Sequence, residues 1–354
     1  MAITAVLVLR TALRCLFVVC VCLSNAGFAQ PAAQPPAKLP AKPPAKLPAQ
    51  LAAQLAAQPP ADCPPTAQAP SPEQVQAGMR DARDRGFLWR IAKGGRHSYL
   101  YGTLHVAKLA WVFPGPRVAQ ALADSDTLAL ELDMLDAGVH QRLVEGVVAA
   151  AAGALPEPLR QRLARLAATE CLAPETIASL GPELQVAALM SMVGRRDGLD
   201  PAYGIDVFLS GWARASRKTV VSLETPELQL RALLMPNPSE QLSFVENALD
   251  NLESGRARPQ LARIAQVWAD SDLDTLTRFE EWCECLKTRS DRDAMARILD
   301  QRNPALADGI AALHASGRRV FAAIGSLHMI GPGGLPALLA QRGYRVERIT
   351  AATP

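Results

Sequence analysis

The sequence predicts an α/β fold, with a mixed and largely parallel sheet and a large helical insertion in its middle. Two apolar runs, Ser98–Tyr101 and Val320–Ile324, are each followed by a Gly-x-x-His motif. Two further apolar runs, Thr127–Leu132 and Thr219–Leu223, carry a glutamate near or just past their ends. Alanine- and leucine-rich stretches typical of helices fill the middle of the chain. Strand-rich ends around a helical middle indicate an α/β domain.

The expected elements follow one another along the chain. Phe87–Ile91 and His97–Tyr101 are expected to form a hairpin, because Lys93-Gly94-Gly95 between them is a turn signal. Prolines divide the stretch after the Thr127–Leu132 strand into several helices. The other expected elements are a helix at Pro116–Ala123, helices within Val139–Val193 and up to about Ser316, and strands at Arg319–Ile324 and Tyr344–Ile349.

The chain is predicted to have three parts. Residues 1–29 combine Arg10, Arg14, an apolar core and Gly27-Phe28-Ala29, which is the pattern of a secretory signal peptide. Residues 30–72 are rich in Pro, Ala, Gln and Lys and are predicted to be a disordered, semi-extended linker. Residues 73–354 are left for the α/β domain, with the helical insertion at about 137–217 and 226–316. We therefore expect an exported, periplasmic or envelope-associated protein, with an uncleaved anchor as the alternative to cleavage.

Charge patterning limits the classes of partner. The formal net charge is +3, acids and bases are interspersed, and no basic face with interleaved aromatic residues is seen. Nucleic acid is therefore not expected as a partner. No segment after the signal is apolar for long enough to span a membrane. A peptide or small-molecule substrate is expected instead, together with envelope association through the N-terminal segment.

Four cysteines remain beyond the signal segment, namely Cys63, Cys171, Cys283 and Cys285. An even number in an exported protein favours structural disulfides over free thiols, and three pairings are possible. A Cys283–Cys285 bridge would close a very small ring, so a longer-range pair would stabilise the chain more. A zinc site is not favoured, because the usual C-x-x-C spacing is missing.

Four ligand-type side chains are predicted to meet at one edge of the sheet. His105, Glu131, Glu224 and His328 each stand at or just past the carboxyl end of a predicted strand. Open α/β sheets place their chemistry at this edge. Two histidines and two carboxylates could bind Mn²⁺, Co²⁺, Fe²⁺ or Zn²⁺, and a water held there would be acidified. For each residue alone, the competing interpretation is a polar group that caps a helix or pairs with an arginine.

Motifs over most of the expected domain carry a family resemblance. In order they are Tyr99-Leu100-Tyr101-Gly102-Thr103-Leu104-His105, Leu128–Asp133, Tyr203–Asp206, Leu223-Glu224-Thr225 with Gln229 downstream, Arg302-Asn303 and Ala323–His328. This string, between about Phe87 and Val346, resembles the TraB/GumN family, which includes the animal Tiki proteins. The resemblance implies a fold related to the erythromycin-esterase and ChaN-like proteins. It also implies metal-dependent hydrolysis of peptide bonds, by way of the Tiki branch.

Further residues are assigned supporting roles. Arg302 is expected either to hold a substrate carboxylate or oxyanion, or to form a salt bridge that orients Glu131 or Glu224. Asp206 and Asn303 are expected to orient the ligands. Two alternatives to a peptide hydrolase stay open: a non-catalytic envelope protein that binds or sequesters a peptide, and an esterase. Metal content separates the hydrolase from the peptide-binding protein.

Overall fold

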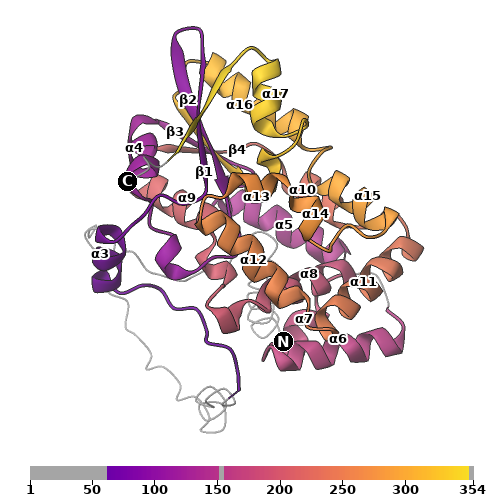
Figure 1. The fold of residues 1–354 in the computed structure, drawn as a ribbon. Helices are drawn as coiled ribbons and strands as arrows, with labels where there is room; N and C mark the ends of the chain where they lie inside the picture. Colours follow the sequence, from indigo (N-terminus) through magenta and orange to yellow (C-terminus); the bar gives the residue numbers. More distant parts are fainter. Residues whose placement is uncertain (1–61, 151–154, 351–354) are drawn as a thin grey trace, which may run out of the picture.

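A six-stranded sheet forms the centre of the protein (Figure 1), which we describe from a computed structural model that defines residues 62–150 and 155–350. The strand order is β4-β3-β5-β2-β1-β6. The strands are β1 (Phe87–Lys93), β2 (Arg96–Thr103), β3 (Thr127–Leu130), β4 (Thr219–Ser222), β5 (Val320–Gly325) and β6 (Arg345–Ile349). The predicted signal segment, residues 1–29, and residues 30–61 of the predicted linker lie outside the described residues.

The sheet is mixed and mostly parallel, which confirms the predicted fold class. β1 and β2 form the expected antiparallel hairpin, with Gly94 and Gly95 at positive φ in its turn. β6 pairs antiparallel with β1, whereas β2, β3 and β4 run parallel to their neighbours β5, β5 and β3. In the β2–β5 pair, Thr103 lies opposite Gly325. The two strands that lead into the Gly-x-x-His motifs are therefore adjacent and end at the same edge.

Helices fill the connections between the strands. The α-helices are α3 (Pro72–Arg80), α4 (Pro116–Asp124), α5 (Ala137–Ala150), α6 (Glu157–Thr169), α7 (Pro174–Ala178), α8 (Pro182–Met192), α9 (Ile205–Ala215), α10 (Pro226–Leu233), α11 (Pro238–Glu253), α12 (Ala257–Ala269), α13 (Leu273–Thr277), α14 (Phe279–Trp282), α15 (Arg289–Ile298), α16 (Asn303–Ala315) and α17 (Leu335–Gln341). Short 3-10 turns are η1 (Leu109–Trp111), η2 (Arg195–Asp197), η3 (Pro201–Tyr203) and η4 (Ser326–Met329). Proline in the first turn marks the start of many of these helices, because it lacks the N–H that the first turn leaves unbonded.

Most helices divide between two large apolar cores, and a small third cluster joins Val106, Leu199 and Ala265. One core surrounds the sheet and includes Leu100, Leu128 and Phe321, with Ile310 of α16 packed against the sheet. The second core lies within the helical part and includes Leu184 of α8. Figure 1 shows this division, with the strands gathered at one end of the molecule and α6, α7, α8 and α11 at the other. Between β3 and β4, and again between β4 and β5, the chain leaves the sheet and builds this helical part.

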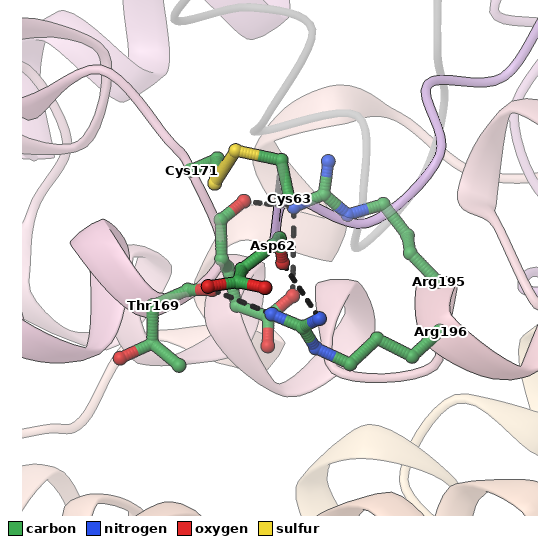
Figure 2. The surroundings of a disulfide bond; sticks show 7 residues. Asp62, Cys63, Thr169, Cys171, Arg195 and Arg196 are labelled. Carbon is green, nitrogen blue, oxygen red and sulfur yellow. Dashed lines mark hydrogen bonds and ion pairs between the residues drawn. A yellow bond between two sulfur atoms is a disulfide. The ribbon is translucent and has the colours of Figure 1, made fainter. Parts of the chain in front are cut away.

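A disulfide attaches the segment before α3 to the helical part (Figure 2). Cys63 is bonded to Cys171, which follows α6. Beside the bridge, the guanidinium of Arg196 donates to the carbonyl oxygens of Asp62 at 2.8 Å and Thr169 at 3.0 Å. The second disulfide joins Cys283 and Cys285. The predicted structural disulfides are therefore present, and the long-range pair is Cys63–Cys171.

None of the helices in residues 62–150 and 155–350 is long and apolar enough to cross a membrane.

Candidate functional site

Four adjacent parallel strands deliver the four predicted residues to one edge of the sheet. His105 comes two residues after β2, Glu131 directly after β3, Glu224 two residues after β4, and His328 in η4 after β5. The strand predicted at Thr127–Leu132 ends earlier, at Leu130. Backbone pairing nonetheless continues past β3 and β4, since the Glu224 N–H donates to the Glu131 carbonyl at 3.0 Å.

Gly325 marks the point at which three of these side chains meet. A β-carbon at this position would lie 3.2 Å from His105 Nε2, 3.3 Å from Glu131 Oε1 and 3.6 Å from His328 Cδ2. Its backbone N–H also donates to Glu131 Oε1 at 2.8 Å. Glycine is needed here because the backbone passes so close to the three side chains. The structure therefore brings His105, Glu131 and His328 together around the end of β5.

The His105 ring is held by Asp206 in the first turn of α9. Its Nδ1–H donates to Asp206 Oδ2 at 2.7 Å, and the Thr103 hydroxyl donates to the other oxygen, Oδ1, at 2.6 Å. Because an ionised carboxylate only accepts hydrogen bonds, Nδ1 carries the proton and Nε2 is directed elsewhere. Burial opposes a charge on the ring, but Asp206 and Glu131 outweigh it and raise the pKa of His105 to about 9.

His328 is held in the same way by Asn303, the first residue of α16. The Asn303 amide nitrogen donates to the Gly333 carbonyl at 2.8 Å, which directs its Oδ1 toward His328 Nδ1 at 2.5 Å. An amide oxygen only accepts, so Nδ1 carries the proton and Nε2 keeps its lone pair. Burial, with a smaller contribution from Arg302, lowers the pKa of His328 to about 4. His328 is therefore neutral at pH 7, in the form that binds metals.

Glu131 lies between the two Nε2 atoms. Its Oε1 is 3.8 Å from Nε2 of His105 and its Oε2 is 3.9 Å from Nε2 of His328. Both separations exceed a hydrogen bond. The side chain is buried, which alone would raise its pKa, but the nearby His328, Arg302 and His105 hold the pKa of Glu131 well below its usual range. Glu131 is therefore an ionised carboxylate facing two imidazole nitrogens.

Arg302 joins the two glutamates. Its Nη2 donates to Glu131 Oε2 at 2.5 Å and also to Glu224 Oε2, and its Nε donates to Glu224 Oε1 at 2.8 Å. The Gln229 amide adds a contact to Glu224 Oε2 at 3.2 Å. Burial lowers the pKa of an arginine, but the two carboxylates outweigh it and raise the pKa of Arg302. Of its two predicted roles, the geometry shows the salt bridge, and it reaches both glutamates.

The donor chemistry at this point fits a divalent metal ion. Two ligand atoms that each lie about 2.0–2.2 Å from one ion can be at most about 4.4 Å apart, and the 3.8 and 3.9 Å separations around Glu131 satisfy this limit. Both histidines have Nδ1 engaged by an oxygen acceptor, as metal-binding histidines do. Within residues 62–150 and 155–350, no group of three or more His, Cys, Asp or Glu side chains is already placed to hold an ion. Binding would therefore draw the side chains closer together.

Glu224 lies in a different setting from the other three predicted ligands. Its carboxylate is directed to Arg302 and Gln229, and it is buried. Its assignment as a metal ligand stays a prediction. Arg302, which pairs with Glu224, holds Oε2 of Glu131, whereas the Gly325 N–H holds Oε1.

A cavity of about 220 Å³ opens beside these groups. His105, Glu131, Arg302 and His328 line one part of it, and apolar side chains from several helices line the rest. Sequence reasoning missed the cavity, since its apolar lining looks like ordinary helix core. It also missed Thr103, which fixes Asp206, although Thr103 stands inside the first Gly-x-x-His motif. Trp268 also lines the cavity and donates from Nε1 to the Gly102 carbonyl at 2.8 Å.

Comparison with known proteins gives one family and two curated relatives. The model of the TraB/PrgY/gumN family matches residues 87–348. The chain is 27% identical over 247 residues to the uncharacterized protein YbaP of Shigella flexneri, and 26% identical over 247 residues to that of Escherichia coli strain K12. Each match covers 70% of this chain and 89% of the relative. No solved structure matches the chain.

Proposed function

The chain belongs to the TraB/PrgY/gumN family, and from this premise we propose that it is an exported, divalent-metal-dependent hydrolase that acts on peptide bonds. The observation that carries the proposal is the matched pair of histidines. In each, an oxygen acceptor fixes the proton on Nδ1 and directs Nε2 toward the same carboxylate, Glu131. A purely structural histidine pair would not need Nε2 of both rings to face one buried carboxylate.

The proposed metal is held by His105, His328 and Glu131. A divalent ion bound there would acidify a water and polarise the substrate carbonyl. Mn²⁺, Co²⁺, Fe²⁺ and Zn²⁺ all accept imidazole and carboxylate ligands, so the donor set does not select among them.

The protein groups have separate tasks in this proposal. Asp206 and Asn303 keep Nδ1 of each ring engaged and direct Nε2 toward Glu131. His105, whose pKa is raised to about 9, would lose the proton on Nε2 when the metal binds. Glu131 supplies negative charge, and Arg302 holds the carboxylates of Glu131 and Glu224 in place. Glu224, the fourth predicted ligand, pairs with Arg302 and so holds the guanidinium against Glu131. The apolar side of the cavity limits the number of waters that compete for the reacting carbonyl.

Hydrolysis of a peptide library by the metal-loaded protein tests the proposal. Wild-type protein is treated with a chelator, reloaded in turn with Mn²⁺, Co²⁺, Fe²⁺ or Zn²⁺, and assayed beside His328→Ala. We expect cleavage with at least one metal and loss of cleavage in the variant, because the variant lacks a ligand on a rigid strand end. Metal-independent cleavage, or equal cleavage by the variant, would contradict the proposal. Binding of peptides without any cleavage would favour the non-catalytic peptide-binding alternative.

Export is a separate part of the proposal and rests on the signal-like residues 1–29 and on the cysteine usage. N-terminal sequencing of protein recovered from the cell envelope should give Gln30 as the first residue. A protein that begins at Met1 in the cytosol would contradict export.

A further inference from the structure

The cavity beside the strand-end groups has a second, apolar part that the proposed chemistry does not use. Resting on the proposed function, we propose that this part is a specificity chamber, which receives one large apolar side chain adjacent to the peptide bond that is cut. We define the chamber by Leu104, Ala232, Leu233, Ile264, Leu276 and Ile298. The substrate class is then a peptide with leucine, methionine, phenylalanine or a similar residue next to the scissile bond.

The first argument is the origin of the two parts of the cavity. The reacting groups come from the ends of β2, β3 and β5, whereas the chamber walls other than Leu104 come from helices between β4 and β5. Ala232 and Leu233 lie at the end of α10, Ile264 on α12, Leu276 on α13 and Ile298 at the end of α15. Because both parts belong to one cavity, a side chain in the chamber is joined to a backbone that passes the reacting groups.

The second argument is that the chamber walls keep apolar surface available. Leu233, Ile264 and Ile298 are only partly buried, although each lines the cavity. Apolar surface that faces water is unfavourable, and covering it with an apolar ligand group is favoured in proportion to the area buried. Trp268, whose indole N–H is fixed on the Gly102 carbonyl, adds a large aromatic surface to the same cavity.

The third argument concerns charge. The titratable side chains that line the cavity are His105, Glu131, Arg302 and His328, of which His328 is neutral at pH 7. Glu131 and Arg302 are already paired with each other, and His105 with Asp206. A lysine, aspartate or glutamate side chain in the chamber would therefore lose its water among six residues that have no polar side chain. The chamber should reject charged side chains as well as accept apolar ones.

The fourth argument is size. A cavity of about 150 Å³ lined by aliphatic side chains is enough to hold benzene. The whole cavity here has about 220 Å³. It can therefore hold one large aliphatic or aromatic side chain together with the carbonyl group beside it, but not two such side chains.

A pair of substitutions on α10 tests the chamber. Ala232→Phe should fill it, whereas Leu228→Phe places the same side chain at a position on the same helix that is 43% exposed and outside the cavity. Metal-loaded proteins are assayed with fluorogenic peptides that carry Phe, Leu, Ala, Gly or Lys beside the scissile bond. In wild-type protein and in Leu228→Phe, kcat/KM for the Phe or Leu peptides should exceed that for the Gly and Lys peptides by about tenfold or more. In Ala232→Phe this preference should disappear.

Leu233→Ala is a second variant, which enlarges the chamber and should shift the preference toward larger side chains. Calorimetric binding of N-acetyl-phenylalaninamide and N-acetyl-glycinamide adds a measurement that needs no turnover.

Cleavage without an apolar preference, or a preference unchanged in Ala232→Phe and Leu233→Ala, contradicts the chamber but not the proposed hydrolase activity. Binding of the phenylalanine amide that Ala232→Phe removes, without cleavage of any peptide, supports the chamber and contradicts the hydrolase. Binding of neither amide, with no cleavage, overturns both.

Discussion

At the scale of single residues, the site depends on hydrogen bonds that set the histidine tautomers. Asp206 and Asn303 each accept a hydrogen bond from Nδ1 of a histidine. Asp206 is itself fixed by the hydroxyl of Thr103, and Asn303 by its own hydrogen bond to the Gly333 carbonyl. Supporting groups of this kind keep ligand rings within the narrow range of positions that metal binding needs. The two rings are therefore prepared for a ligand by residues that lie on α9 and α16, away from the strands.

Gly325→Ala tests how closely the site is packed. The new methyl group would meet His105 Nε2 at 3.2 Å and Glu131 Oε1 at 3.3 Å, so both must shift. We expect a loss of peptide hydrolysis of about tenfold to a hundredfold, with about 1–3 kcal/mol of lost stability. Gly211→Ala in α9 is the matched control, because its nearest contact would be an ordinary 3.9 Å. That control should keep full activity, and wild-type activity in Gly325→Ala would contradict the packing described here.

Asp206→Asn tests the charge on His105 through pH. In metal-free protein the pKa of His105 is raised to about 9, above the ordinary value of about 6.5. Its ion pair therefore stabilises the folded state fully below about pH 6.5, and this contribution is lost as the pH rises through about 9. Histidine NMR titration in chelator should give a lower pKa in Asp206→Asn. Urea unfolding should show a weaker fall of stability between these pH values in the variant, and identical titrations would contradict the assignment.

At the scale of elements, the sequence predicted the strands and their shared edge but not what the helices place beside them. The repeated Gly-x-x-His pattern after apolar runs was enough to predict β2 and β5, and each strand bound was correct to within two residues. The salt bridge from Arg302 to two glutamates was one of two alternatives, because it depends on how α16 docks on the sheet. The apolar chamber could not be predicted, because all its walls except Leu104 lie on four separate helices. Leucines on such helices look alike in the sequence whether they face a core or a cavity.

The Cys63–Cys171 bridge makes a prediction about the helical part. It spans 108 positions, and the chain-entropy model gives about 4–5 kcal/mol for a loop of that length, against about 2–4 kcal/mol in typical measurements. Cys63→Ser should therefore lower the unfolding temperature markedly. Cys285→Ser breaks a bridge that spans only two positions, so it should lower the unfolding temperature by less. Neither Cys63 nor Cys171 is among the residues that line the cavity, so activity per folded molecule should be unchanged. A larger fall of the unfolding temperature in Cys285→Ser than in Cys63→Ser would contradict this account.

At the scale of the whole molecule, the proposed function would separate the reacting groups from the groups that recognise the substrate. Strand ends on a rigid sheet hold His105, Glu131 and His328, and the helical part supplies the apolar side of the same cavity. A site on a sheet edge is positioned by a packed core, whereas helices in the long connections can differ without disturbing it.

The most direct test of the central claim is a measurement of metal content together with hydrolysis. Chelated wild-type protein, His105→Ala, His328→Ala and Gly211→Ala are each titrated with the activating metal, and bound ion and peptide cleavage are recorded on the same samples. The account predicts one ion per chain in wild-type protein and Gly211→Ala, with cleavage rising in proportion to bound ion. Both histidine variants should lose the ion and the cleavage while keeping their fold by circular dichroism. Full cleavage by either histidine variant, or an ion retained by both, would contradict the site described here.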